Sequence, residues 1–106
     1  MGKIPNEKTI EKMEKVLNVA SDYTRLLIMY CLLDQERCVY EIQNEVGVSQ
    51  SLISHQLKVL KDAKLVARRK EGTKVYYSLD DEHVNQLLKI VYAHVTHGDK
   101  QHETNI

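Results

Sequence analysis

Four side chains near the end of the chain are of types that bind zinc, and they occur as two close pairs. The first pair is Asp81 and His83, and the second is His94 and His97. Zinc sites in proteins are usually tetrahedral and use histidine nitrogen, cysteine sulfur or carboxylate oxygen. Three imidazoles and one carboxylate are therefore a complete set of ligands for one zinc ion.

The stretch 78–98 that carries these pairs is predicted to form one helix. Its apolar residues recur at the spacing of a helical stripe, which consists of Val84, Leu87, Leu88, Val91 and Val95. Asp80 or Asp81 can cap the start of this helix, and Gly98 can end it in the left-handed conformation. The helix would place the candidate ligands beside an apolar face.

The spacing of the two pairs predicts metal sites that are shared between two chains. At about 100° per residue, His83 and His94 lie about 20° apart around the helix axis, and His97 lies about 40° to the other side of His83. Along the axis His83 and His94 are about 16 Å apart, whereas zinc–nitrogen bonds are about 2 Å long. One helix cannot close all four ligands on one ion, but two antiparallel copies in a homodimer can. The first pair of one chain would meet the second pair of the other, which gives two zinc ions per dimer with the apolar stripe as the seam.

Periodic apolar residues predict four earlier helices, over residues 6–20, 23–33, 39–46 and 49–63. Asp22 and Ser49 are placed to cap the second and fourth of them, and Gly47 lets the chain turn between the third and fourth. In the fourth helix a buried stripe is expected, consisting of Leu52, Ile53, Leu57 and Leu60. Two helices joined in this way, the second with a polar outer face, form a helix-turn-helix pattern.

Two short strands are predicted after the helix-turn-helix, over residues 65–70 and 74–79. Residues 71–73 between them can form a hairpin loop in which Gly72 adopts positive φ. The predicted order of elements is ααααββα. The expected fold is therefore mainly α with a β-hairpin wing, a winged helix-turn-helix that forms a homodimer.

The polar face of the fourth helix is equipped to bind double-stranded operator DNA. Near its start it carries hydrogen-bonding side chains that can reach base edges in a major groove, namely Gln50, Ser51, Ser54 and His55. Basic residues that can neutralise phosphates follow on this helix and on the hairpin, namely Lys58, Lys61, Arg68, Arg69, Lys70 and Lys74. Because a dimer presents two such helices to successive major grooves, the operator is expected to be an inverted repeat.

Composition and charge limit the other classes of protein. The 106 residues carry a formal net charge of zero, but residues 58–74 hold seven basic and two acidic side chains. We expect one domain over residues 1–106, with residues 1–9 and 99–106 flexible. No stretch approaches the roughly 20 apolar residues of a membrane span, and the start does not resemble a signal peptide, so we expect a cytoplasmic protein without a membrane partner. Cys31 and Cys38 are expected to be buried, reduced thiols.

The chain resembles the ArsR/SmtB family of metal-responsive repressors, and within it the CzrA-type zinc/cobalt sensors. The resemblance runs from about residue 12 to residue 97 and is carried by VSQSLISHQLKVLKDAKLV, RRKEGTKVYYSL and DDEHVNQLLKIVYAHVTH. It implies a homodimer that binds its operator when metal-free and releases it when zinc binds. It also implies the same metal ligands, Asp81, His83, His94 and His97, and the same operator-contacting positions, Gln50, Ser51, Ser54 and His55.

Departures from the family pattern leave two alternatives to a zinc sensor open. Soft-metal sensors of the family use Cys-x-Cys in the third helix, where this chain has only Cys38, so a thiolate site for cadmium, lead or arsenite is incomplete. His102 lies five residues after His97, and related nickel/cobalt sensors add tail histidines, so a nickel/cobalt sensor is one alternative. A repressor that responds to thiol oxidation through Cys31 and Cys38 is the other. An enzyme is not expected, because four protein ligands leave no open position on zinc for a reacting water.

Overall fold

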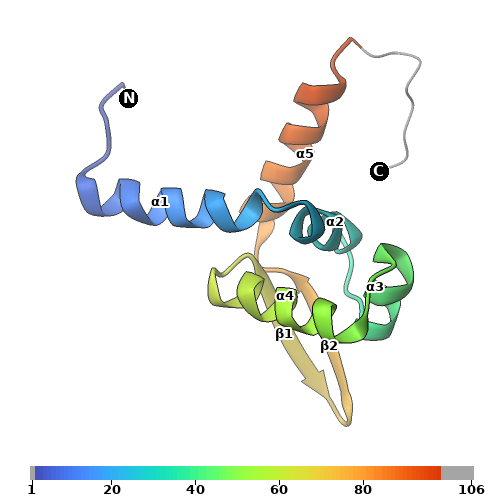
Figure 1. Cartoon of the computed structure of the whole chain (residues 1–106). Helices are drawn as coiled ribbons and strands as arrows, with labels where there is room; N and C mark the ends of the chain where they lie inside the picture. Colours follow the sequence, from blue (N-terminus) through green and yellow to red (C-terminus); the bar gives the residue numbers. More distant parts are fainter. Residues whose placement is uncertain (1, 99–106) are drawn as a thin grey trace.

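The computed structural model describes residues 2–98, which form five helices and one β-hairpin (Figure 1). The helices are α1 (Glu7–Ala20), α2 (Tyr23–Cys31), α3 (Val39–Val46), α4 (Gln50–Asp62) and α5 (Glu82–Thr96). The strands are β1 (Val66–Glu71) and β2 (Lys74–Leu79). The predicted order ααααββα and the winged helix-turn-helix fold are confirmed. Of the segments expected to be flexible, 99–106 and with it His102 lie outside the described residues, and 7–9 belong to α1.

Side-chain caps begin four of the helices. The caps and the residues whose backbone N–H groups they accept are Asn6 with Thr9, Asp22 with Arg25, Ser49 with Leu52 and Asp81 with Val84, at 2.9–3.2 Å. Each cap satisfies an N–H group that has no partner within its helix. Asp22 and Ser49 are confirmed as caps, and Asp81 is the cap of α5. The prediction of helix from residue 78 was wrong at its start, because Ser78 and Leu79 complete β2.

The core lies between α2, α3, α4, the base of the hairpin and the first half of α5. Its most buried side chains are at most 1% exposed, and they are Ile28, Met29, Leu32, Ile42, Ile53, Leu57, Leu60 and Val66. Each such burial contributes about 1.5–3 kcal/mol, so this cluster fixes the inner face of α4. Leu52 was predicted to be buried with that face but is 37% exposed, because it lies about 100° around the helix from Ile53. Gly47 between α3 and α4 has φ 81°, as predicted.

The hairpin is antiparallel, and the edge of β2 that does not pair with β1 is attached to the body. Val66 pairs with Leu79 at its base, and Gly72 in its loop has φ 64°. On the other edge of β2, Arg37 from the segment between α2 and α3 pairs with Tyr77. The Arg37 N–H donates to the Tyr77 carbonyl at 2.9 Å, and the Tyr77 N–H donates back at 2.8 Å. A single bridging residue leaves no alternating pattern in the sequence, so this attachment was not predicted.

Helices α1 and α5 extend from the body, and α5 points away on the side opposite to the hairpin (Figure 1). No residue of α1 is buried, and α5 buries only Val84 and Leu88. The Tyr30 hydroxyl of α2 donates to the Leu88 carbonyl at 2.7 Å and holds the first half of α5 on the core. None of the helices within residues 2–98 is long and apolar enough to cross a membrane.

Candidate DNA interface and metal site

The outer face of α4 carries the side chains predicted to contact DNA. Its inner face is fixed by Ile53, Leu57 and Leu60, which are buried. The side chains predicted to contact bases and phosphates from this helix are all exposed, namely Gln50, Ser51, Ser54, His55, Lys58 and Lys61. At about 100° per residue they lie within about 140° of one another around the axis. The fold therefore gathers these six side chains on one helix face.

A groove of about 290 Å³ lies between α4 and the wing. It is lined by Ser54, Leu57, Lys58, Lys61, Asp62, Arg68 and Tyr77. Arg68 of β1 thus shares a groove with the two lysines of α4, which concentrates positive charge between helix and wing. Lys58 Nζ lies 3.2 Å from the Asp62 carboxylate, but these side chains are 74% and 63% exposed. Exposed pairs of this kind are weak, so Lys58 can exchange its partner for a phosphate.

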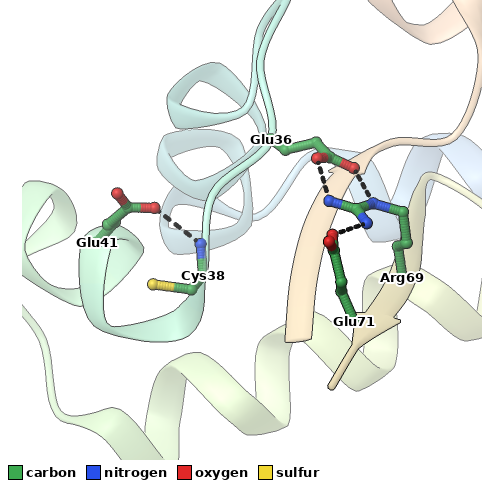
Figure 2. A network of polar contacts seen from close by, with 5 residues as sticks. All are labelled: Glu36, Cys38, Glu41, Arg69 and Glu71. Carbon is green, nitrogen blue, oxygen red and sulfur yellow. Dashed lines mark hydrogen bonds and ion pairs between the residues drawn. The ribbon is translucent and has the colours of Figure 1, made fainter. Parts of the chain in front are cut away.

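The other predicted phosphate contacts lie on the wing and differ in their surroundings. Lys70 and Lys74 are exposed and flank the loop at its tip. Arg69 instead forms two hydrogen bonds of 2.9 Å to the Glu36 carboxylate and another of 2.6 Å to Glu71 (Figure 2). These bonds lower the pKa of the Glu36 carboxyl and raise the pKa of Arg69 above its ordinary value. The charge of Arg69 is therefore compensated within the chain.

The candidate ligands Asp81 and His83 converge at the start of α5. Asp81 Oδ2 lies 3.5 Å from His83 Nδ1, while Asp81 Oδ1 accepts the capping bond from Val84. Both side chains are exposed. Two ligand atoms that are each about 2.0–2.1 Å from a tetrahedral zinc ion are about 3.3–3.4 Å apart. The 3.5 Å between Asp81 Oδ2 and His83 Nδ1 is therefore close to the spacing of two ligand atoms on one zinc ion.

The candidate ligands His94 and His97 lie at the opposite end of α5, and both are exposed. The His97 N–H donates to the His94 carbonyl at 3.4 Å where the helix ends, and Gly98 follows with φ 89°. Because the 15 residues of α5 span about 22 Å, one chain holds its two pairs far apart. Within residues 2–98 no three or more His, Cys, Asp or Glu side chains form a group that could hold a metal ion. The structure brings Asp81 to His83 but does not bring the two pairs together.

An uncovered apolar face runs along α5 between the two pairs. Its large exposed side chains are Leu87, Ile90, Val91 and Val95, and α1 presents Ile10, Met13 and Leu17 in the same way. The predicted stripe of α5 thus divides, with Val84 and Leu88 facing the core and the rest facing outwards. Ile90 was not in the predicted stripe. Its spacing from Leu87 would have revealed it, because residues three apart share a helix face.

Both cysteines are free thiols and are partly buried. Burial raises the pKa of the Cys31 thiol above its ordinary value, with a smaller opposing effect of Arg37. Cys38 precedes α3, and its backbone N–H donates to Glu41 Oε1 at 3.0 Å (Figure 2). Since the thiolate is the reactive form, Cys31 is less reactive at neutral pH than an ordinary cysteine.

Comparison with known proteins places these features in a family of regulators. Residues 22–68 match the model described as bacterial regulatory protein, arsR family. The chain is 46% identical to the cadmium resistance transcriptional regulatory protein CadC homolog of Staphylococcus aureus. This match extends over 81 residues and covers 76% of this chain and 67% of the relative. The transcriptional repressor SmtB homolog of Synechocystis sp. is 38% identical to this chain. That match extends over 89 residues and covers 84% of this chain and 67% of the relative.

Solved structures show the same fold. A homodimeric winged helix-turn-helix DNA-binding domain from Mycobacterium bovis matches with a TM-score of 0.81 and 27% sequence identity, and the match covers 100% of both chains. Our chain spans about two thirds of the length of the two curated relatives.

Proposed function

The chain belongs to the ArsR/SmtB family of bacterial transcriptional repressors, and we propose that it is a zinc-responsive member that acts as a homodimer. In this proposal the metal-free dimer binds an inverted-repeat operator, and zinc binding releases it. The family predicted from the sequence is confirmed. The prediction of a regulator and not an enzyme is also confirmed, because the matching family and both relatives are transcriptional regulators. The observation that carries the metal proposal is the convergence of Asp81 and His83.

A second copy of the chain is the proposed cover for α1 and α5. The two helices expose seven large apolar side chains between them, more than isolated surface hydrophobics require. The solved domain from Mycobacterium bovis is described as homodimeric. In a two-fold dimer with antiparallel α5 helices, the apolar faces would cover one another and the ligand pairs would meet at both ends.

DNA binding is assigned to α4 and the wing. Gln50, Ser51, Ser54 and His55 would reach base edges, while Lys58, Lys61, Arg68 and the lysines of the wing tip would neutralise phosphates. The support is the shared outer face of α4 and the basic groove beside it. A dimer would place its two α4 helices in major grooves about 34 Å apart.

The proposed ligands of each zinc ion are Asp81 and His83 of one chain with His94 and His97 of the other. Bound zinc would supply a rigid link between the two α5 helices and so favour one arrangement of the dimer. Thermodynamic linkage requires the two effects to be equal. The DNA-bound dimer must bind metal more weakly than the free dimer by the same factor by which the metal-bound dimer binds DNA more weakly than the metal-free dimer, typically about 5- to 150-fold. The histidines and the carboxylate also suit cobalt and nickel, and His102, the additional nickel candidate, lies outside the described residues.

A thiol-responsive repressor is the less favoured alternative. The raised pKa of Cys31 lowers its thiolate fraction at neutral pH. Asp81 and His83, in contrast, are exposed, and the 3.5 Å between Asp81 Oδ2 and His83 Nδ1 is a distance that two ligands of one zinc ion can have. We therefore favour a response to metal over a response to oxidants.

Mixing two non-binding variants tests the shared site directly. One variant is Asp81→Asn with His83→Ala, and the other is His94→Ala with His97→Ala. Each homodimer lacks half of every site, so neither is expected to bind zinc tightly. After subunit exchange each heterodimer has one intact site, because its complete pairs come from different chains. When half of all dimers are heterodimers, one zinc ion per heterodimer corresponds to about a quarter of a zinc ion per chain in the whole mixture.

Cobalt absorption and zinc titration by equilibrium dialysis report the outcome. Tetrahedral cobalt spectra should be absent from each variant alone and should appear in the mixture. Failure to recover binding in exchanged heterodimers, or full binding by either variant alone, would contradict a site shared between chains.

A further inference from the structure

Arg68 and Arg69 are neighbours on β1 but face opposite sides of the wing, as successive residues of a strand do. Arg68, opposite Tyr77 in the hairpin register, lines the groove beside α4. Arg69, opposite Tyr76, turns to the segment between α2 and α3 (Figure 2). From the sequence alone the two arginines were equivalent, since both were predicted to bind phosphate. The structure distinguishes them by the face of the wing on which each lies.

The guanidinium of Arg69, whose side chain is 48% exposed, is paired with partners from two parts of the chain. Its Nε and one terminal nitrogen each lie 2.9 Å from a different oxygen of Glu36, and its remaining nitrogen lies 2.6 Å from Glu71. The ring of Tyr76 lies beneath it, with 4.9 Å from the guanidinium carbon to the ring centre. Two-pronged pairing of this kind fixes orientation as well as charge. The positive charge of a side chain held in this way is compensated by its two carboxylate partners, which disfavours a further bond to a phosphate.

The segment that supplies Glu36 is itself attached on both sides. The next residue, Arg37, forms the two backbone hydrogen bonds with Tyr77 of β2. Asp34, two residues before Glu36, pairs with Lys89 of α5 at 2.9 Å, and its backbone N–H donates to Asn85 Oδ1 at 3.1 Å. Glu36 is therefore a fixed point on the body against which the wing can be held.

We infer that Arg69 and Glu36 position the wing for DNA, and that Arg69 does not itself bind a phosphate. The inference rests on the proposed role of the wing in DNA binding. A two-stranded hairpin is marginally stable alone, and β1 beyond Ala67 is exposed. The Glu36–Arg69 pair and the Arg37–Tyr77 bridge set the direction in which the hairpin leaves the body. That direction decides whether Arg68, Lys70 and Lys74 meet the DNA backbone while α4 lies in the groove.

The salt dependence of DNA binding separates a positioning residue from a phosphate contact. The logarithm of affinity falls linearly with the logarithm of salt concentration, with a slope of about −0.9 per phosphate neutralised. Arg68→Gln removes one phosphate contact from each chain of the dimer, so it should make this slope shallower by about two units. Arg69→Gln should lower the affinity about two- to fivefold at every salt concentration and leave the slope unchanged. Arg69→Lys should behave like Arg69→Gln, because a lysine keeps the charge but not the two-pronged pairing.

Glu36→Gln gives the sharpest contrast, because it removes a negative charge from a protein that binds a polyanion. Electrostatics alone predicts tighter binding, whereas loss of the wing anchor predicts weaker binding by a factor similar to that of Arg69→Gln. Glu45→Gln on α3 is the matched control that removes one carboxylate outside this network, and it should not weaken binding. Circular dichroism and thermal unfolding of every variant show whether it is folded.

Fluorescence anisotropy measures the affinity of each variant for one DNA duplex over a range of salt concentrations. These affinities also give the salt slope of each variant. If Arg69→Gln makes the slope shallower as Arg68→Gln does, or if Glu36→Gln tightens binding, the inference is overturned while the DNA-binding wing stands. If neither arginine variant changes affinity or slope, the wing does not act in DNA binding, and the proposed function of the wing fails together with the inference.

Discussion

At the scale of single residues, the two oxygens of Asp81 serve different purposes. Oδ1 accepts the hydrogen bond that caps α5, and Oδ2 lies 3.5 Å from His83 Nδ1. A metal ion between this pair would use the second oxygen and leave the cap in place. One side chain would thus couple the start of the helix to the metal site.

Two substitutions of Asp81 separate these roles. Asn caps helices as well as Asp does, so Asp81→Asn should leave stability within a few tenths of a kcal/mol, whereas Asp81→Ala should cost about 1 kcal/mol. Both should lower zinc affinity about tenfold or more, because a charged ligand is lost. Urea unfolding in the presence of chelator gives the stabilities, and competition with a chelating dye gives the affinities. Zinc binding by Asp81→Asn as tight as that of the unsubstituted protein would exclude Asp81 as a ligand.

The distance along the chain decided which residue contacts could be predicted. Asp81 and His83 were paired from the sequence because they lie only two positions apart in it. The partner of Arg69, Glu36, lies 33 residues away. Nothing in the local pattern around Arg69 indicates that partner, so a structural arginine had the same appearance as a phosphate contact.

At the scale of elements, α4 ends in an unusual way for its sequence. Lys64 follows the helix with φ 60°, a left-handed conformation that favours glycine. The Leu65 N–H donates to the Leu60 carbonyl and the Lys64 N–H to the Lys61 carbonyl, both at 2.9 Å. This is the Schellman pattern of bonds, and it turns the chain from α4 into β1. The sequence contained no glycine to mark this end.

Replacing Lys64 by glycine should therefore stabilise the protein. The left-handed conformation costs a residue with a Cβ about 1–2 kcal/mol, and glycine adopts it freely. After the greater flexibility of glycine in the unfolded chain is subtracted, Lys64→Gly should gain about 0.5–1 kcal/mol. Lys64→Ala is the matched control and should gain nothing, because alanine keeps the Cβ. Thermal and urea unfolding in chelator measure both, and equal stabilities of the two variants would refute the strain.

Caps and glycines made most helix and strand boundaries predictable from the sequence. Whether an apolar residue is buried or exposed was harder to predict. The bounds of α3 agree with the prediction, and Gly47 ends it in the left-handed conformation. Leu52 was expected to be buried but is 37% exposed, and two residues of the stripe expected at the dimer seam, Val84 and Leu88, are instead buried in the core of their own chain. A helical stripe looks the same in the sequence whether it packs against the same chain or against a second copy.

At the scale of the whole molecule, the apolar faces of α1 and α5 are the proposed dimer interface. Ile90 is 65% exposed and lies on α5 between the two ligand pairs. A charge at this position would be tolerated by the single chain but would be buried without a partner in the dimer, which is costly.

Ile90→Glu should give a folded monomer with weakened DNA and zinc binding. Tyr40→Glu is the matched control, because Tyr40 on α3 is 69% exposed and lies outside the proposed interface. Analytical ultracentrifugation should find a dimer for Tyr40→Glu and a monomer for Ile90→Glu, with native circular dichroism for both. A stable Ile90→Glu dimer would show that α5 does not form the interface.

In the proposed mechanism, zinc at α5 controls DNA binding by α4 and the wing. The most direct test is fluorescence anisotropy with labelled DNA from upstream of the protein's own gene at fixed salt. It is measured first with chelator, then with one zinc per chain, and then with His97→Ala under the same conditions. We predict tight binding with chelator, a loss of about tenfold or more on zinc addition, and no loss for His97→Ala. Tight binding that zinc does not weaken would show that zinc at α5 does not control DNA binding.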